Sequence, residues 1–574
     1  MIYDTTTPHS RLSNPRVPKV VEETVVIEYH PGLMDSNEVI SSHWADLTAD
    51  RIIRERGEKD IYVCASGITP SGTVHIGNFR EIISVDLVVR ALKDRGRGVR
   101  FIYSWDDYDV FRTVPLNMPK QELLVTYLRK PITLVPDVLG NEQSYAAHNE
   151  KALEEILPLL GIEPEYIYQA ECYRSSRYAE GIKKALDHRE DIRGQLDAHR
   201  STPLPEDWYP ISVFCASCDR DTTRVCNWDG DYAVSYVCDS CGNHETVDFR
   251  FSSAVKLPWR IDWPMRWWME SVDFEPAGKD HHSEGGSFDT ARITSKEVFG
   301  VQPPLTFQYD FVRIKGGSGK MSSSSGEAIS LADVLLYYQP ELVRFLFAST
   351  RPNSEFAISF DLDVLKNYED YDRVERSYFN RPEHPRKLAK WKRDARVYEL
   401  SQVHETPARL PYQIQIRHLA TLLQIHSGDI DGVISWLGDV PEIDVKRLRT
   451  RSQCALNWLR DFAPEDFRFS LRNAEDDPVP LPENLSAAVG ALGVLAGDAL
   501  GDVTEKEFGV RMYQLMREHG LESPDFFTAI YRAIIGKDRG PRLVNFLHIL
   551  GRKRVLNLLQ PYIDIENLRS AGRA

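Results

Sequence analysis

The 574-residue sequence lacks any run of about 18 apolar residues, so it contains no segment that could cross a membrane as a helix. Its first twenty residues, MIYDTTTPHSRLSNPRVPKV, also lack the apolar core of a secretory signal peptide. Residues 1–37 instead have the composition of a polar extension, which we expect to be flexible. These absences exclude a helical membrane protein and favour a cytoplasmic one.

Cysteine is scarce, with 8 residues in the whole chain, which excludes a disulfide-stabilised scaffold. Four of them nevertheless form two CxxC pairs separated by nineteen residues: Cys215, Cys218, Cys238 and Cys241. Two such pairs supply the four thiolates of a tetrahedral structural Zn²⁺ site, and the residues between them favour strands. We therefore predict a zinc ribbon at residues 209–251. Cys226 and His244 stay open as additional or substitute ligands.

The chain also lacks a positive net charge; its formal charge is −15, which argues against a surface covered by nucleic acid. Despite the negative net charge, three stretches are locally basic: residues 381–396, 446–451 and 552–554. Any one of them could be a solvated helix face. Three in the C-terminal half together predict a surface that follows a phosphate backbone.

The stretch 60–78, DIYVCASGITPSGTVHIGN, organises the N-terminal half of the chain. An apolar run typical of a buried strand is followed by a loop of small residues and then by residues 76–92, whose apolar positions repeat with helical spacing. This strand–loop–helix order is typical of phosphate binding, because the backbone N–H groups at a helix N-terminus carry partial positive charge. Gly67, Gly72 and Gly77 allow the backbone to approach a ligand closely.

Further strands are predicted at residues 98–105, 166–169 and 305–314, and helices at residues 38–58, 153–160 and 175–186. Asp106, Asp107 and Asp109 follow the strand 98–105, at the edge where open parallel sheets bind ligands. Beyond residue 330 helical periodicity predominates, with helices predicted at 331–347, 361–379, 413–425, 485–500 and 504–518.

This pattern predicts a Rossmann-like α/β domain with a parallel sheet, interrupted by the ribbon and followed by an all-α region. The expected divisions are 1–37, 38–208, 209–251, 252–330 and 331–574.

Tryptophan is concentrated in residues 256–268, KLPWRIDWPMRWW, where Arg260, Asp262 and Arg266 alternate with the indoles. Aromatic stripes most often pack in a core, but this mixture indicates the wall of a pocket. A second strand-to-helix turn, residues 278–282, carries polar side chains at the same sheet edge. Farther along, residues 316–326, GGSGKMSSSSG, form a glycine-bracketed loop with one lysine and a row of hydroxyls.

An HIGN loop early and a KMSSS loop late resemble the paired signature of class I aminoacyl-tRNA synthetases. The segments KLPWRIDWPMRW, WDDYDVFRTVP, GKDH, KMSSSSGE and GKDRGPRLVNFLHILG resemble, more narrowly, the class I lysyl-tRNA synthetases. The resemblance runs from about residue 39 to the C-terminus and leaves residues 1–37 unmatched.

The resemblance implies a lysine–tRNA ligase, which uses ATP with Mg²⁺ to convert L-lysine to lysyl-adenylate and then esterifies tRNA(Lys). It implies that His75 and Lys320 are catalytic and that the C-terminal helices read an anticodon; we expect a monomer. The implied ATP-binding residues are Pro70, Gly72, His75, Gly77, Asn78, Lys320, Met321, Ser322, Ser323 and Ser324. The implied lysine-binding residues are Gly67, Thr69, Trp259, His281 and Tyr309, with Asp107 or Asp280 as the counter-charge.

Two positions depart from the family signature. Asn78 stands where a second histidine is frequent, and Ser323 stands where many class I enzymes have a second lysine. Because of these departures, we expect Lys320, Ser322 and the backbone to provide more of the stabilisation of the phosphate charge.

Two alternatives stay open. Another class I synthetase, such as a glutamyl enzyme, would need a basic residue in the side-chain pocket. A non-catalytic tRNA-binding paralogue would be expected to lose His75 or Lys320, and both are present.

Overall fold

The computed structural model describes residues 43–572 except residues 117, 317–328 and 474–475. The predictions for residues 1–37 and for Lys320, Met321, Ser322, Ser323 and Ser324 therefore lie outside the described residues.

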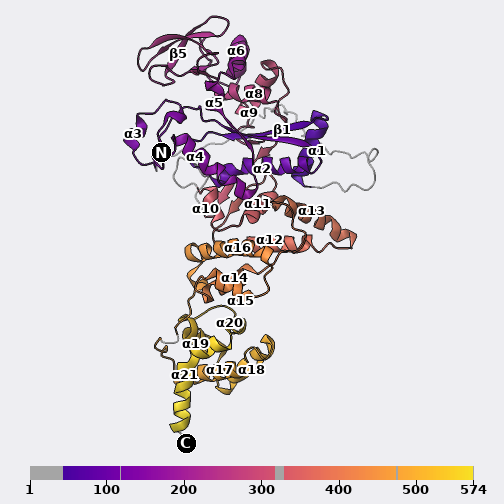
Figure 1. The fold of residues 1–574 in the computed structure, drawn as a ribbon, viewed down its shortest axis with the longest axis vertical. Helices are drawn as coiled ribbons and strands as arrows, with labels where there is room; N and C mark the ends of the chain where they lie inside the picture. The colour runs from indigo at the N-terminus through magenta and orange to yellow at the C-terminus, as the bar shows by residue number, and fades with distance from the viewer. Residues whose placement is uncertain (1–42, 117, 317–328, 474–475, 573–574) are drawn as a thin grey trace, which may run out of the picture. The chain divides into compact units, whose positions relative to one another are not determined.

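A parallel sheet forms the centre of the N-terminal half, as predicted (Figure 1). Strands β1 (Ile61–Ile68), β2 (Gly98–Trp105) and β3 (Glu165–Tyr168) pair in the order β1-β2-β3. On the free side of β1, the Ala65 N–H donates to the Phe274 carbonyl at 2.8 Å, and the Leu305 N–H donates to the Asp273 carbonyl at 2.8 Å. Strands β9 (Ala277–Gly278) and β10 (Gln308–Tyr309) then pair in parallel. The carboxyl ends of these strands consequently meet at one edge of the sheet.

Helix α2 (Ile76–Lys93) connects β1 to β2 and buries nearly every apolar residue that predicted it. The helix predicted at 38–58 is α1 (Trp44–Arg56). The helix predicted at 153–160 was misplaced: α4 (Tyr145–Glu154) ends before it, and a 3₁₀ turn, η2 (Leu157–Leu160), contains Pro158, which lacks a backbone donor.

The helix predicted at 175–186 was wrong at its start. The helix α6 (Ala179–Asp187) begins four residues later than predicted. Residues 175–178 instead separate it from α5 (Gln169–Arg174), because Ser176 has a φ of 57°, which a helix does not accommodate. The other elements of this half are α3 (Gln121–Val125), η1 (Ile132–Leu134), α7 (Arg189–Asp197), α8 (Trp259–Glu270) and α9 (Ser287–Glu297).

Residues 214–254 leave the α/β domain through an antiparallel pair of short strands, β4 (Ser212–Val213) and β8 (Val255–Lys256). Beyond this pair, β5 (Thr223–Trp228), β6 (Ala233–Cys238) and β7 (His244–Asp248) form an antiparallel sheet.

Strands β11 (Val312–Ile314) and β12 (Phe356–Ile358) pair in parallel, and every element after β12 in the described ranges is helical. The single helix predicted at 331–347 was wrong. It is two helices, α10 (Leu331–Leu335) and α11 (Pro340–Ala348), because Pro340 forces the preceding Gln339 to an extended ψ of 152°. The remaining helices are α12 (Asp363–Tyr378), α13 (Pro385–Ser401), α14 (Ile416–Ile425), α15 (Ile430–Leu437), α16 (Glu442–Asp461), η3 (Glu465–Phe467), α17 (Glu483–Ala499), α18 (Glu505–Glu518), α19 (Ser523–Ile535), α20 (Leu543–Leu550) and α21 (Arg552–Gly572).

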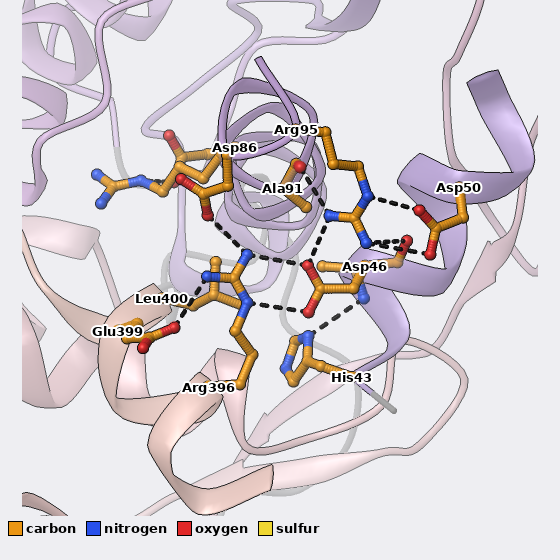
Figure 2. Close-up of polar contacts among 12 residues, drawn as sticks. His43, Asp46, Asp50, Asp86, Ala91, Arg95, Arg396, Glu399 and Leu400 are labelled. Atoms are coloured by element: carbon orange, nitrogen blue, oxygen red, sulfur yellow. Dashed lines mark hydrogen bonds and ion pairs between the residues drawn. The ribbon is translucent and has the colours of Figure 1, made fainter. Parts of the chain in front are cut away.

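A network of buried ion pairs joins α2 to helices far away in the sequence. Figure 2 shows Asp46 of α1 between Arg95, which follows α2, and Arg396 of α13; each guanidinium lies 2.9 Å from its carboxylate. Asp86 of α2 pairs with the fully buried Arg344 of α11 at 2.7 Å. A buried charge is tolerated only when it is paired and hydrogen-bonded, so these contacts fix how the helices dock.

The three basic stretches carry less free charge than their sequences indicate. Arg396 pairs with Asp46, Arg447 with Glu375, Arg451 with Asp372 and Arg552 with Asp502. Within the described ranges, four basic residues of α13 are exposed and have no acidic partner: Arg386, Lys387, Lys390 and Arg393.

Arg451 and Arg449 provide a direct test of the difference between a buried and an exposed ion pair. Arg451, 4% exposed, donates to both Asp372 oxygens at 2.7 and 2.6 Å, whereas Arg449 pairs with Asp431 at the surface. Arg451→Met should lower the free energy of unfolding of the helical region by roughly 3–5 kcal/mol, because it leaves a buried carboxylate unpaired. Arg449→Met should leave the urea midpoint near that of the wild type. Equal midpoints for the two variants would contradict this assignment.

Candidate functional site

His75 is the N-cap of α2, and its ring fixes the loop that precedes the helix. Its Nδ1 accepts the backbone N–H groups of Gly77 and Asn78 at 3.0 and 3.3 Å, while Asn78 Oδ1 accepts the His75 N–H at 3.2 Å. Because Nδ1 is the acceptor, the neutral ring carries its proton on Nε2. The first turn of α2 contains no acidic residue, so its partial positive charge is not neutralised there.

A cavity of about 250 Å³, here called the outer cavity, lies against this helix end. Six residues predicted for the site line it: Gly67, His75, Gly77, Asn78, His281 and Tyr309. Asp280, one of the two predicted counter-charges, lines it as well. The segments on either side of residues 317–328 also reach this place. Phe311 and Val312 line the cavity, and the Ile329 carbonyl accepts from the Ile76 N–H at 3.0 Å.

A second cavity of about 60 Å³, here called the inner cavity, shares Ser66, Gly67, Glu81 and His281 with the outer one. Three indoles spaced four residues apart on α8 form one wall: Trp259, Trp263 and Trp267. This spacing places them on one face of the helix, so the predicted pocket wall is present. The fourth tryptophan of the cluster, Trp268, stacks on Phe299 instead.

Four carboxyl groups line the inner cavity: Glu81, Asp106, Glu270 and Glu275. Asp106 lies 2.6 Å from Arg266, yet burial raises its pKa to about 6. Glu270 accepts from Arg100 at 2.7 Å and pairs with Arg177.

Glu81 and Glu275 are held by neutral donors. Glu81 accepts from the Tyr309 hydroxyl, from Ser66 Oγ at 2.8 Å and from the Gly67 N–H at 3.2 Å. Glu275 accepts from the indole N–H groups of Trp263 and Trp267 at 3.0 and 2.5 Å.

Burial disfavours the charged form of both glutamates. It raises the pKa of Glu81 against its hydrogen bonds. Burial, followed by the charge of Glu81, raises the pKa of Glu275 to about 7.

Four predicted residues lie outside both cavities. Thr69 donates to Asp109 at 3.1 Å, and Asp109 pairs with Lys256 at 2.6 Å. Pro70 and Gly72 are buried in the loop before His75. Asp107 accepts the Ala170 N–H at 2.8 Å at the start of α5, and burial raises its pKa to about 7.

Trp259 packs against its neighbours on the same helix, α8. Its ring stacks on Trp263 at a centroid distance of 4.7 Å, and the Arg266 guanidinium lies 5.1 Å from its centroid. The indoles therefore act here chiefly as packed walls and, for Trp263 and Trp267, as hydrogen-bond donors.

Sequence reasoning missed Ser66, Glu81, Gln169 and Glu275, which all line the inner cavity. A signal was available for Glu81, because it lies one turn beyond Gly77 on a helix that begins at the ligand loop. No local pattern marks Glu275, since its donors come from another element.

The four predicted cysteines converge at the base of the β5–β7 sheet, with their Sγ atoms all within 4.8 Å of one another. The Sγ–Sγ distances are 3.6 Å for Cys215–Cys241 and for Cys218–Cys238, too long for a disulfide. Tetrahedral Zn–S bonds of about 2.3 Å place ligand sulfurs about 3.8 Å apart, so the donor set fits zinc. Cys226 is exposed and, like His244, stands outside this cluster.

No helix in the described ranges is both long and apolar enough to span a membrane.

The family model described as "tRNA synthetases class I (K)" matches residues 42–404. The chain belongs to this family. Among curated relatives, it is 52% identical to the lysine–tRNA ligase of Borreliella burgdorferi over 91% of this chain and 100% of that protein. It is 49% identical to that of Treponema pallidum (91% and 99%) and 42% identical to that of Thermococcus kodakarensis (90% and 99%).

Among solved structures, a glutamate tRNA ligase from Elizabethkingia meningosepticum, solved with its amino acid, matches with a TM-score of 0.40 and 14% identity. The match covers 88% of this chain and 99% of that one. At this TM-score the likeness adds nothing to the assignment.

Proposed function

We propose that the chain is a lysine–tRNA ligase that activates L-lysine with ATP and transfers it to the 3′-terminal adenosine of tRNA(Lys). The observation that carries this proposal is the 52% identity to a curated lysine–tRNA ligase over that protein's whole length. The site is consistent with it: a helix N-terminus suited to phosphates adjoins a small, acid-lined cavity suited to an amine.

In this proposal ATP occupies the outer cavity. The Nε2 proton of His75 and the positive end of α2 face the triphosphate. Gly77 and Asn78 hold the His75 ring through their N–H groups, and the backbone at Pro70 and Gly72 shapes the loop. The residues that follow β11 in the sequence and that we propose to contact the same nucleotide are Lys320, Met321, Ser322, Ser323 and Ser324. Asp280, which lines the outer cavity, is the carboxylate that would hold a Mg²⁺ ion or its waters, and the ion would supply neutralisation of the phosphate charge. Adenylation then depends on positioning and charge stabilisation, which these residues supply.

The lysine carboxylate must reach the α-phosphate in the outer cavity, so its side chain extends toward the inner one past Gly67 and His281. Trp259 and Tyr309 bound this path, and Thr69 supports it indirectly through Asp109. In a glutamyl enzyme, the substrate side chain would add a fifth carboxylate to the four that line the inner cavity, and it would need a cation that is not already paired. Arg266, the arginine that lines the inner cavity, is already committed to Asp106 and Asp262.

We also propose that Cys215, Cys218, Cys238 and Cys241 hold a structural Zn²⁺ in a ribbon at residues 209–251, inserted between the catalytic segments 38–208 and 252–330. Because the four thiols converge from two separate parts of this segment, the metal would cross-link them and stabilise the fold of the ribbon.

Residues 331–574 are proposed as an all-α region that contacts the tRNA stem and anticodon. The exposed basic residues of α13 are its most suitable phosphate-binding face, because acidic neighbours do not neutralise them. Charge reversal at Arg449 and Arg451, in the basic stretch 446–451, would combine any effect on tRNA binding with the loss of the buried Arg451–Asp372 ion pair.

The function is tested by charging assays with each of the twenty amino acids in the presence of tRNA and ATP; lysine alone should be esterified.

Lys320→Ala should lower kcat by orders of magnitude with a small change in lysine KM, because the Lys320 side chain acts on charge that develops in the transition state. Lys315→Ala is the matched control, since Lys315 pairs with Asp361 and Asp363 beside the same segment. Charging of another amino acid would overturn the proposal, and equal rates for the two variants would remove Lys320 from catalysis.

Zinc is tested by elemental analysis. The wild-type protein should contain one equivalent, and replacing Cys215 and Cys218 with Ser should release it and destabilise the ribbon. Cys226→Ser should retain the metal because its thiol lies outside the cluster. A metal-free wild-type protein would refute this site.

The α13 face is tested by Lys390→Glu, with Lys296→Glu of α9 as an equally charged, exposed control. Lys390→Glu should raise the tRNA KM several-fold and lower the slope of log KM against log salt by about one, because one phosphate contact releases about 0.9 counterion. KM values for ATP and lysine should not change. If both variants raise the tRNA KM equally, α13 is not a specific contact face.

A further inference from the structure

Arg80, in the second turn of α2, is a buried cation that takes no part in the site described above. It is 1% exposed, and its guanidinium carbon lies 5.8 Å from the ring centroid of Phe347 and 5.2 Å from that of Phe356. Its Nε and Nη1 groups are buried without a hydrogen-bond partner among the residues that the structure describes. Burial lowers the pKa of Arg80 to about 10, so the group is still charged at neutral pH. Keeping such a cation away from water is costly, which indicates that its contacts have a use.

The remaining nitrogen of the guanidinium, Nη2, holds one turn of the chain against α2. It donates to three carbonyls of the turn 351–354: those of Arg351 at 2.6 Å, Pro352 at 2.7 Å and Ser354 at 3.2 Å. Hydrogen bonds from a charged donor are shorter and stronger than those between neutral groups. The turn therefore cannot move away from α2 without losing all three bonds at once.

The turn 351–354 is connected to the outer cavity in two ways. The Pro352 carbonyl also accepts the N–H of Asp310, directly after β10, at 2.9 Å. Strand β12 follows the turn and pairs in parallel with β11. The residues of this stretch that line the outer cavity, here called the strand wall, are Tyr309, Phe311 and Val312. A displacement of the turn would therefore displace the strand wall.

Another side of the same cavity belongs to α2 and its N-cap. The residues that form it are His75, Gly77, Asn78, Glu81 and Ile82. Arg80 lies among them in the sequence but lines neither cavity. It therefore joins the helix side of the outer cavity to the strand wall without touching what the cavity holds.

We propose that Arg80 is a positioning residue for adenylation, which holds the strand wall at a fixed distance from the N-terminus of α2. This inference rests on the proposed function, in which ATP occupies the outer cavity, and deepens it by naming the residue that sets the separation of two sides. The α-phosphate must lie among groups that stabilise its developing charge. A misplacement of about 1 Å can cost about a hundredfold in rate, so the separation matters for the reaction.

A guanidinium suits this role better than other side chains do. It packs against aromatic rings while its N–H groups keep fixed directions. A lysine side chain is shorter, so at position 80 it would keep the charge but would not reach all three carbonyls equally well. A methionine would fill the space and leave the three carbonyls without their donor.

Charging kinetics with the two diastereomers of ATPαS, in which sulfur replaces one or the other free oxygen of the α-phosphate, test the proposal. The ratio of kcat/KM for the two diastereomers does not depend on the fraction of folded enzyme, so a purely structural loss leaves it unchanged. The wild-type protein should prefer one diastereomer, because its α-phosphate is held from two sides. Arg80→Met should lower kcat/KM for ATP about tenfold to a hundredfold and reduce this preference. Arg80→Lys should lie between Arg80→Met and the wild type in both measurements.

Arg189→Met is the matched control. Arg189 lies 4.2 Å from the ring centroid of Tyr209 and donates to the Glu206 carbonyl. Its Nε is also buried without a hydrogen-bond partner in the described ranges, but Arg189 lines neither cavity. The variant should keep the wild-type kcat/KM for ATP and the wild-type preference.

A wild-type preference in Arg80→Met, even with a lower kcat/KM, would overturn the proposal and leave Arg80 with a role in stability alone. If Arg80→Met does not fold, a wild-type preference in Arg80→Lys would overturn it in the same way. An equal loss of preference in Arg189→Met would also overturn it. A wild-type protein that charges lysine without distinguishing the diastereomers would refute the positioning and leave the function standing. A wild-type protein that charges no lysine would overturn the proposed function itself.

Discussion

The site depends on how α2 is held. One end of this helix carries His75, and the rest is tied by buried ion pairs to α1, α11 and α13, with Asp46 and Asp86 each shared between two arginines. A paired, fully hydrogen-bonded charge in a protein interior tolerates little displacement. A small shift weakens the attraction to its partner, and the free-energy cost of removing the charge from water is then no longer offset. The helical region therefore positions the ligand loop, although it lies hundreds of residues later in the sequence.

The sequence predicted best those elements whose signal is local. The strand 98–105 was confirmed residue for residue because its apolar run is bounded on both sides. Predicted helix boundaries were wrong where a single residue interrupted a helix despite the helical periodicity, as Pro340 does between α10 and α11. The ion pairs of Figure 2 could not be predicted, because their partners come from distant segments.

In the candidate site, too, the features with a local sequence signal were predicted and those that depend on distant segments were not. Gly67, His75, Gly77, Asn78, His281 and Tyr309 were expected and line the cavities. The tryptophans were also expected there, as a pocket wall. The structure adds that Trp263 and Trp267 donate their N–H groups to a buried glutamate. Composition reveals that indoles are concentrated in a segment, whereas the direction of each N–H depends on packing against elements encoded elsewhere.

The histidine at position 75 both caps α2 and carries a proton on the opposite side of its ring. Serine or aspartate would cap a helix at least as well, so capping alone does not require an imidazole. Only a ring with two nitrogens can accept from Gly77 and Asn78 on one side and carry a proton on the other. Acidification would protonate Nδ1 and break both caps, so the loop geometry and the tautomer would be lost together. The first turn of the helix thus fixes the protonation state of its own N-cap residue.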